Sequence, residues 1–159
     1  MIVLGIDPGT ARMGYGIVQI LPKNKLKLLV ADVIITPAGM DQHKRLLMLH
    51  KKLVSLVKEF SPNTMVVEKL FFNTNAKTAM TVGQARGVSM LVAALNKLDF
   101  FEYTALQAKL VLAGYGRADK KQMQEAVRSA LKLKNVIKSD DANDAVAMAL
   151  CFIRKELKC

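Results

Sequence analysis

The chain has 159 residues, a length typical of one domain, and 52% of its residues are hydrophobic while 23% are charged. This composition excludes an intrinsically disordered chain, which would lack the apolar residues needed for a core. Lys and Arg number 24 against 13 Asp and Glu, and the resulting net charge of +11 predicts a polyanionic partner, nucleic acid first of all. The alternative is a basic surface that only keeps the protein in solution. We expect residues 1–159 to form a single domain.

The sequence shows no sign of export or membrane insertion. Residues 1–7 are apolar but have no basic segment, and they reach Asp7 too early for a signal peptide. No apolar run approaches the ~18 residues of a membrane span. The two cysteines, Cys151 and Cys159, form no CxxC pair. We therefore expect a reduced, cytoplasmic protein with no membrane partner and no structural zinc.

Three short apolar runs open the chain, and turn sequences that contain proline separate them: residues 2–7, 14–20 and 26–36. These runs predict three antiparallel strands. Residues 41–60 place apolar side chains at helical spacing and lysines on the other face, which predicts an amphipathic helix lying on the sheet. Residues 64–68 (TMVVE) then predict a buried central strand that ends on an acid.

Helical composition dominates the second half, with one further strand expected at residues 100–104. We expect helices at residues 75–98, 106–112, 120–133 and 141–157. Gly83 and Gly87 are four residues apart in the first of these helices, which would let another backbone or a partner subunit approach closely. The order of elements predicts an α/β fold: a five-stranded mixed sheet, its first three strands antiparallel, flanked by helices.

Acids at strand ends are unexpected in so basic a chain, because a buried charge is costly unless it is paired or bound to a metal. Asp7 and Glu68 each end an apolar strand, and Asp141 and Asp144 are three residues apart on one helical face. Together they could gather around hard cations such as Mg²⁺ or Mn²⁺, and two ions ~4 Å apart can clamp the oxygens of a phosphodiester. Each acid alone also has an ordinary explanation: a turn cap, an ion pair with lysine, or a charge at a helix N-terminus.

Three blocks of the sequence resemble the RuvC family of Holliday-junction resolvases in order and spacing: GIDPGTARMGYGIV, VVEKLFFNTNAKTAMTVGQARG and DDANDAVAMAL. The segment FEYTALQAKLVLAGYGRADKKQM resembles the family's linking region, so the resemblance extends to about residue 152. It implies a ribonuclease-H-like fold and an endonuclease that resolves Holliday junctions in recombination and DNA repair. It also implies homodimers that make paired, symmetric nicks with Mg²⁺ or Mn²⁺, leaving 5′-phosphate and 3′-hydroxyl ends, and a RuvAB-type branch-migration complex as partner.

The resemblance assigns roles to individual residues. The family's four metal-binding catalytic carboxylates fall on Asp7, Glu68, Asp141 and Asp144. Asp140 does not match, and some relatives have histidine at the position of Asp141. Lys109 and Lys120 match lysines near the scissile DNA, where an ammonium group helps to stabilise transition-state charge. Lys121 would replace Lys120 in a shifted alignment, and a solvated basic face is the alternative for all three lysines.

Further candidates concern DNA contacts. Phe71 matches the family's base-contacting aromatic, and with Phe72 it lies in a polar setting in which exposed rings stack on unpaired bases, although paired phenylalanines also occur in cores. Arg86 and the basic run of Lys132, Lys134 and Lys138 are candidate phosphate ligands.

The chain departs from the family pattern in two loops. Ala105 replaces a frequent proline, and KNVIKS before Asp141 lacks a proline-containing stretch.

We interpret Asp7 as bridging two divalent ions, with Glu68 and Asp144 completing their shells and Asp141 supporting one ion and its water. Three alternatives stay open. A YqgF-like relative that processes ribosomal RNA also begins with a strand and Asp-x-Gly-Thr, but it lacks the GQARG block. A sugar-kinase or actin-like ATPase needs two such domains. A non-catalytic protein could bind junctions through its basic face, but it would not need four converging acids.

Overall fold

The computed structural model describes residues 1–69 and 76–158. Its strands are β1 (Ile2–Asp7), β2 (Arg12–Leu21), β3 (Lys25–Ile35), β4 (Thr64–Glu68) and β5 (Asp99–Tyr103). Its helices are α1 (Gln42–Phe60), α2 (Ala76–Leu95), α3 (Ala105–Ala113), α4 (Lys120–Ala130) and α5 (Asp140–Glu156), and a short 3₁₀ turn, Pro22–Asn24, joins β2 to β3. The order of elements is the predicted one.

Two helices end earlier than the sequence predicts. Helix α2 ends at Leu95 instead of residue 98, and α4 ends at Ala130 instead of residue 133. In both cases a lysine just beyond the helix, Lys97 or Lys132, adopts a positive φ of 56° or 52°. A residue in the left-handed region cannot continue a right-handed helix, so the chain turns away there.

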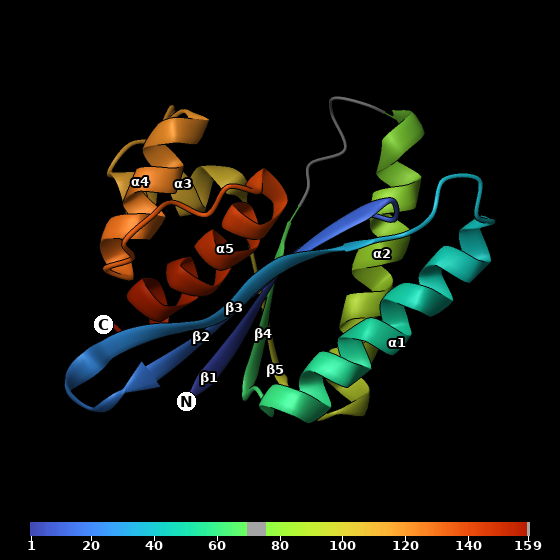
Figure 1. Cartoon of the computed structure of the whole chain (residues 1–159), viewed down its shortest axis with the longest axis horizontal. Coiled ribbons are helices and arrows are strands. Elements are labelled where there is room, and N and C mark those ends of the chain that lie inside the picture. The colour runs from blue at the N-terminus through green and yellow to red at the C-terminus, as the bar shows by residue number, and fades with distance from the viewer. Residues whose placement is uncertain (70–75, 159) are drawn as a thin grey trace.

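The five strands form one mixed sheet in the order β3-β2-β1-β4-β5 (Figure 1). The pairs β1–β2 and β2–β3 are antiparallel, whereas β1–β4 and β4–β5 are parallel. Helices α1 and α2 cover one face, and α5 covers the other with α3 and α4 beside it (Figure 1). This arrangement confirms the predicted five-stranded mixed sheet whose first three strands are antiparallel.

Strand β1 shows how the sheet separates two hydrophobic cores. Leu4 and Ile6 pack into the core under α1 and α2, whereas Val3 packs into the core under α5, and all three are fully buried. Because successive side chains of a strand point to opposite faces, Gly5 and Asp7 lie on the same side as Val3. The last residue of β1 therefore presents its carboxylate on the face that α5 covers.

Helix α5 lies very close to the sheet because glycines provide the space. A Cβ on Gly5 would lie 1.9 Å from the carbonyl oxygen of Ala145, and a Cβ on Gly14 would lie 1.9 Å from that of Asp141. The helix begins after Ser139, whose hydroxyl accepts a hydrogen bond from the backbone N–H of Ala142 at 3.4 Å. The first turn of α5 is thus held over the ends of β1 and β2.

Replacing Gly14 by alanine should lower the free energy of unfolding by about 2–4 kcal/mol, because the added methyl group overlaps the backbone of α5 and forces the helix away from the sheet. Urea unfolding of the variant and the original chain measures this difference. Lys51→Ala, on an exposed part of α1, is the control and should change stability by less than about 0.5 kcal/mol. A Gly14→Ala chain as stable as the control would contradict so close a contact.

Candidate active site

Asp7 and Glu68 lie side by side at the ends of two parallel strands. Strands β1 and β4 pair with Ile6 opposite Val67, so the two acids that follow are neighbours. Both are partly buried, and their carboxyl groups are hydrogen-bonded to each other. Burial, together with the charges of Glu68 and Asp144, raises the pKa of Asp7 to about 8. Burial also raises the pKa of Glu68, although the hydrogen bond with Asp7 opposes this rise, so the two acids titrate as a pair.

The first turns of α5 bring two more acids to this place. Asp144 contributes to the charge that raises the pKa of Asp7, and Asp141 does so more weakly. Asp144 is exposed, yet its own pKa is raised by partial loss of solvation and then by the charges of Asp140 and Asp141. The four predicted carboxylates therefore form one electrostatically coupled cluster, drawn from β1, β4 and α5.

Two of the predicted lysines border the acids. A pocket of about 210 Å³ is lined by Glu68 and Asp144 together with Lys109 from α3 and Lys120 from α4. Lys109 opposes the rise in the pKa of both acids, because its charge favours their ionised forms. The exposed Lys121 lines a different hollow, so the structure brings Lys109 and Lys120 to the cluster but not Lys121.

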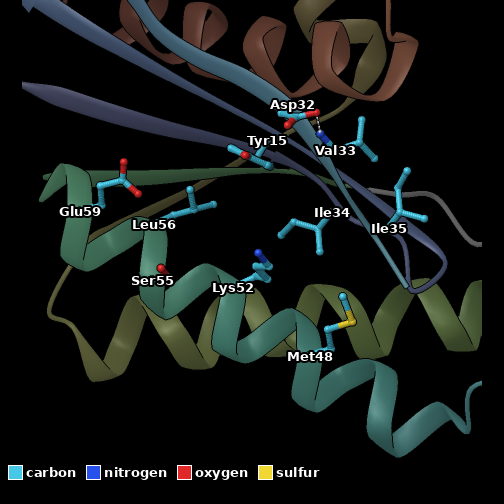
Figure 2. A pocket seen from close by; sticks show the side chains of 10 residues that line it. All are labelled: Tyr15, Asp32, Val33, Ile34, Ile35, Met48, Lys52, Ser55, Leu56 and Glu59. Atoms are coloured by element: carbon cyan, nitrogen blue, oxygen red, sulfur yellow. Dashed lines mark hydrogen bonds between the residues drawn. The ribbon is translucent and has the colours of Figure 1, made fainter. Parts of the chain in front are cut away.

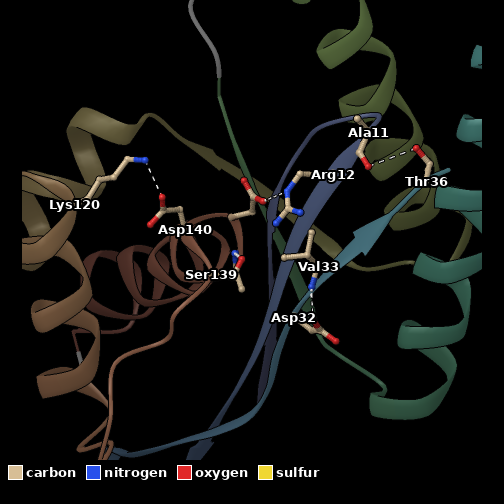
Figure 3. Close-up of polar contacts among 10 residues, drawn as sticks. Ala11, Arg12, Asp32, Val33, Thr36, Lys120, Ser139 and Asp140 are labelled. Atoms are coloured by element: carbon tan, nitrogen blue, oxygen red, sulfur yellow. Dashed lines mark hydrogen bonds and ion pairs between the residues drawn. The ribbon is translucent and has the colours of Figure 1, made fainter. Parts of the chain in front are cut away.

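Arg12, Asp140 and Gln124, which received no role from the sequence, also lie at the cluster. The Arg12 Nε donates to Asp141 Oδ2 at 2.7 Å, and Lys120 Nζ donates to Asp140 Oδ2 at 2.7 Å (Figure 3). Gln124 adds a second, longer hydrogen bond to Asp140 at 3.3 Å. Arg12 lies within the first family-like block, but its proximity to Asp141 depends on the packing of α5 against β2. Strand and helix periodicity alone could not reveal it.

The remaining predicted DNA contacts lie elsewhere. Arg86 forms a two-point ion pair with Glu102, in which Nη2 donates to Oε2 at 2.8 Å. Glu102 alternates with Tyr103, which packs in the core under α5, so this ion pair is on the opposite face of the sheet. The basic run of Lys132, Lys134 and Lys138 is exposed between α4 and α5. Phe71 and Phe72 lie outside the described residues.

A second pocket, of about 400 Å³, lies between β3 and α1 (Figure 2). Its polar lining comes from Tyr15, Asp32, Lys52 and Glu59, and it contains none of the predicted site residues. The Asp32 carboxylate accepts a hydrogen bond from the backbone N–H of Val33 at 2.8 Å. A charged group over an edge strand of this kind discourages pairing with another strand. Because this pocket contains none of the predicted site residues, the acidic cluster is the candidate active site.

The donor chemistry of the cluster fits a divalent metal. Carboxylate oxygens are hard ligands. The pKa of Asp7 is raised by burial and then by neighbouring negative charge, and a bound cation would offset both effects. Within residues 1–69 and 76–158, no three His, Cys, Asp or Glu side chains already have the spacing needed to hold an ion.

A five-stranded sheet of this order, with acids at the ends of the adjacent parallel strands β1 and β4, is that of nucleases of the ribonuclease-H-like fold. The model for the family "Crossover junction endodeoxyribonuclease RuvC" matches residues 3–152. The protein of that name from Alkaliphilus oremlandii is 48% identical over 151 residues, which are 95% of this chain and 92% of the relative.

Solved structures agree with this match. Thermus thermophilus RuvC superposes with a TM-score of 0.90 at 30% identity, over 99% of this chain and 97% of that one. T. thermophilus RuvC in complex with a Holliday junction substrate gives a TM-score of 0.89 at 32% identity, over 95% and 92% of the two chains. The chain belongs to the RuvC family of crossover junction endodeoxyribonucleases, whose nucleases depend on divalent metal. No helix in the described part of the chain is long and apolar enough to cross a membrane.

The raised pKa of Asp7 predicts a pH-dependent stability. Because the folded-state pKa of about 8 exceeds the unfolded value of 3.8, the folded chain binds more protons between these pH values, and metal-free protein should lose stability as pH rises through them. Asp7→Asn removes this loss and should be more stable than the original chain at pH 8 by about 1–3 kcal/mol. Urea unfolding in a chelator from pH 5 to 8 measures the effect.

Asp99→Asn, at the exposed start of β5, is the matched control. It should reproduce the pH dependence of the original chain. If Asp7→Asn follows the same pH curve as this control, the carboxylates do not repel one another as described.

Proposed function

We propose that this chain resolves Holliday junctions in homologous recombination and DNA repair, and that a homodimer nicks two opposed strands symmetrically. The observation that carries the proposal is the coupled carboxylate cluster: Asp7 and Glu68 at neighbouring strand ends, with Asp141 and Asp144 over them on α5. The RuvC of T. thermophilus, similar over almost the whole chain, has been solved with a Holliday junction substrate. The net charge of +11 suits a DNA substrate.

We assign the same four carboxylates to the metal site, which would take two Mg²⁺ ions, with Mn²⁺ as a substitute. Their oxygen-only chemistry supports a hard cation, and the arrival of positive charge would lower the raised pKa values of Asp7 and Glu68. Bound divalent ions supply Lewis-acid stabilisation of the phosphate and lower the pKa of water. Asp141 has the weakest coupling to Asp7, so we place it as the supporting ligand.

The basic residues around the cluster receive distinct roles. Lys109 faces Glu68 and Asp144 across the pocket and would stabilise negative charge that develops on the phosphate. Lys120 is exposed and pairs with an Asp140 that is also well exposed. Surface ion pairs of this kind contribute only about 0–1 kcal/mol, so a DNA phosphate can replace Asp140 as the partner of Lys120. We also propose that the nicks made at this site leave 5′-phosphate and 3′-hydroxyl ends on the cut strands.

The other proposed DNA contacts lie away from the acidic cluster. Lys121 and the basic run of Lys132, Lys134 and Lys138 are exposed and free to meet a DNA backbone at some distance from the acids. Arg86 would first have to leave Glu102. We propose that Phe71 and Phe72 stack on unpaired bases of the junction.

Helix α2 supports the homodimer. Its outer face exposes Met80 (72%), Leu91 (53%) and Leu95 (66%), large apolar side chains that favour burial against a partner. A Cβ built on Gly83 or Gly87 would meet nothing within 4 Å, so a second helix could approach the α2 backbone closely. We propose that two copies meet through α2, since a twofold interface uses the same patch on both subunits.

We further propose that residues 1–159 act as one domain in the cytoplasm, where a chromosomal DNA substrate is available, and that a RuvAB-type branch-migration complex works with the dimer. The family model, which matches residues 3–152 without a break between units, supports the single domain. Family membership supports the partner complex.

Asp7→Asn should reduce cleavage of a four-way junction by at least about 10³-fold in Mg²⁺, because it removes the carboxylate at the centre of the proposed metal site. Junction affinity should stay within about threefold of the original chain, since the basic surface is unchanged. Nick mapping on mobile and immobile junctions and gel-shift binding measure the two quantities.

Full cutting by Asp7→Asn in Mg²⁺ would end the proposal. Binding by the original chain without nicks in any divalent metal would instead favour a non-catalytic junction-binding protein. Preferential cutting of structured RNA would favour a ribosomal-RNA-processing relative.

Leu91→Lys should weaken self-association by at least about tenfold, because it places a charge in the proposed apolar contact between two α2 helices. Sedimentation equilibrium measures this, and paired nicks in the junction should become single nicks. Leu47→Lys on α1 is a matched control, since Leu47 is also 53% exposed. Equal association of both variants would show that α2 is not the dimer contact.

A further inference from the structure

Arg12 has a fixed place beside the acidic cluster. It is the first residue of β2, just after the turn by which the chain leaves β1 at Asp7. The turn is tight, because a Cβ on Gly9 would lie 2.1 Å from the carbonyl oxygen of Arg12. Alternate residues of a strand share a face, so Arg12 lies on the same side as Gly14, against which the first turn of α5 packs. The backbone of Arg12 is therefore held between a rigid turn and the N-terminus of α5.

The contact between the Arg12 side chain and Asp141 uses only part of the hydrogen-bonding capacity of the guanidinium. Its Nε donates to Asp141 Oδ2 at 2.7 Å (Figure 3). A guanidinium has five N–H donors in one plane, and this contact uses the single donor on Nε. The Arg12 side chain is 52% exposed, against 31% for Asp141. The terminal amino groups of Arg12 can therefore meet a ligand that arrives from solvent.

The charges around the cluster favour a phosphate as that ligand. Lys109 and Lys120 border the acids on the side of α3 and α4, beyond β4. Arg12 comes from β2, on the other side of β1, so it supplies positive charge at the opposite border of the same cluster. A guanidinium holds a carboxylate along one edge and a phosphate along another, which an ammonium group cannot do with the same geometry.

We propose that Arg12 links Asp141 to a backbone phosphate of the bound DNA strand, so that it acts both as a phosphate ligand and as a positioning residue for Asp141. An ion pair as exposed as this one adds little to folding stability, so stability alone does not account for the contact. The inference rests on the proposed function, because that function supplies the DNA strand. The inference adds Arg12, on the β2 side of the site, to the residues proposed to contact DNA.

Binding of a four-way junction in a chelator, over a range of salt concentrations, tests the phosphate contact. Arg12→Gln should weaken binding roughly fivefold and make the slope of log affinity against log salt shallower by about one, the change expected for one lost phosphate contact. Lys52→Gln also removes one positive charge, but from the α1 side of the sheet, and it should leave the slope unchanged. An Arg12→Gln slope equal to that of the original chain would overturn the proposal.

Single-turnover cleavage at saturating enzyme tests the positioning of Asp141. Arg12→Gln should lower the maximal rate about tenfold even when all DNA is bound, because Asp141 loses its partner. Arg12→Lys should restore the salt slope but only part of the rate, since it keeps the charge without the planar fork. Full recovery of the rate with lysine, or an unchanged maximal rate in Arg12→Gln, would show that Arg12 does not position Asp141.

The two proposals can fail separately. An original chain that binds junctions but does not cut them in Mg²⁺ refutes the nuclease function. The salt slopes then still decide whether Arg12 contacts a phosphate.

Discussion

The gathering of four carboxylates at one place is the constraint on which the rest of this structure depends. Asp7, Glu68, Asp141 and Asp144 come from three elements that are distant in the chain, and burial together with nearby negative charge raises the pKa values of Asp7, Glu68 and Asp144. Only a rigid scaffold can hold such a cluster together. The scaffold is the contact between α5 and the glycine-containing strands β1 and β2, where helix and sheet backbones approach too closely for any side chain.

The cations around the cluster are arranged so that the site stays open. Arg12 and Lys120 each pair with an acid of the first turn of α5, Asp141 or Asp140, and both ion pairs are exposed. Exposed pairs are weak and easily exchanged, whereas a buried pair would resist rearrangement. The acids nearest the centre, Asp7 and Glu68, are hydrogen-bonded to each other. The residues that border the site can therefore exchange partners at little cost to the stability of the fold.

Much of this architecture could be predicted from the sequence, because strand alternation and helical spacing are local properties. These local patterns predicted that Asp7 and Glu68 end strands. They also predicted that Asp141 and Asp144 share one face of a helix. The sequence also predicted that Asp7 and Glu68 gather with these acids, but it did not reveal the strand register that makes them neighbours, because that depends on parallel pairing between strands separated by a helix. The contacts of Arg12 and Arg86 depend on tertiary packing. The early ends of α2 and α4 arise at lysines with positive φ, a conformation that lysine seldom adopts and sequence rarely reveals.

The opposite charges of the whole chain and of its active site have a consequence for substrate binding. A chain of net charge +11 attracts DNA, yet its acidic cluster would repel a scissile phosphate placed beside it. Divalent cations held by the proposed site would remove that repulsion, and a phosphate would in turn supply oxygen ligands for the cations. Each ligand would then lower the electrostatic cost of binding the other, and thermodynamic linkage makes such assistance mutual. On the proposed function, basic residues distant from the acids would hold DNA without metal, whereas close approach of the phosphate to Asp7 and Glu68 would require it. Junction binding and strand cleavage would then be separated by the distribution of charge over the fold.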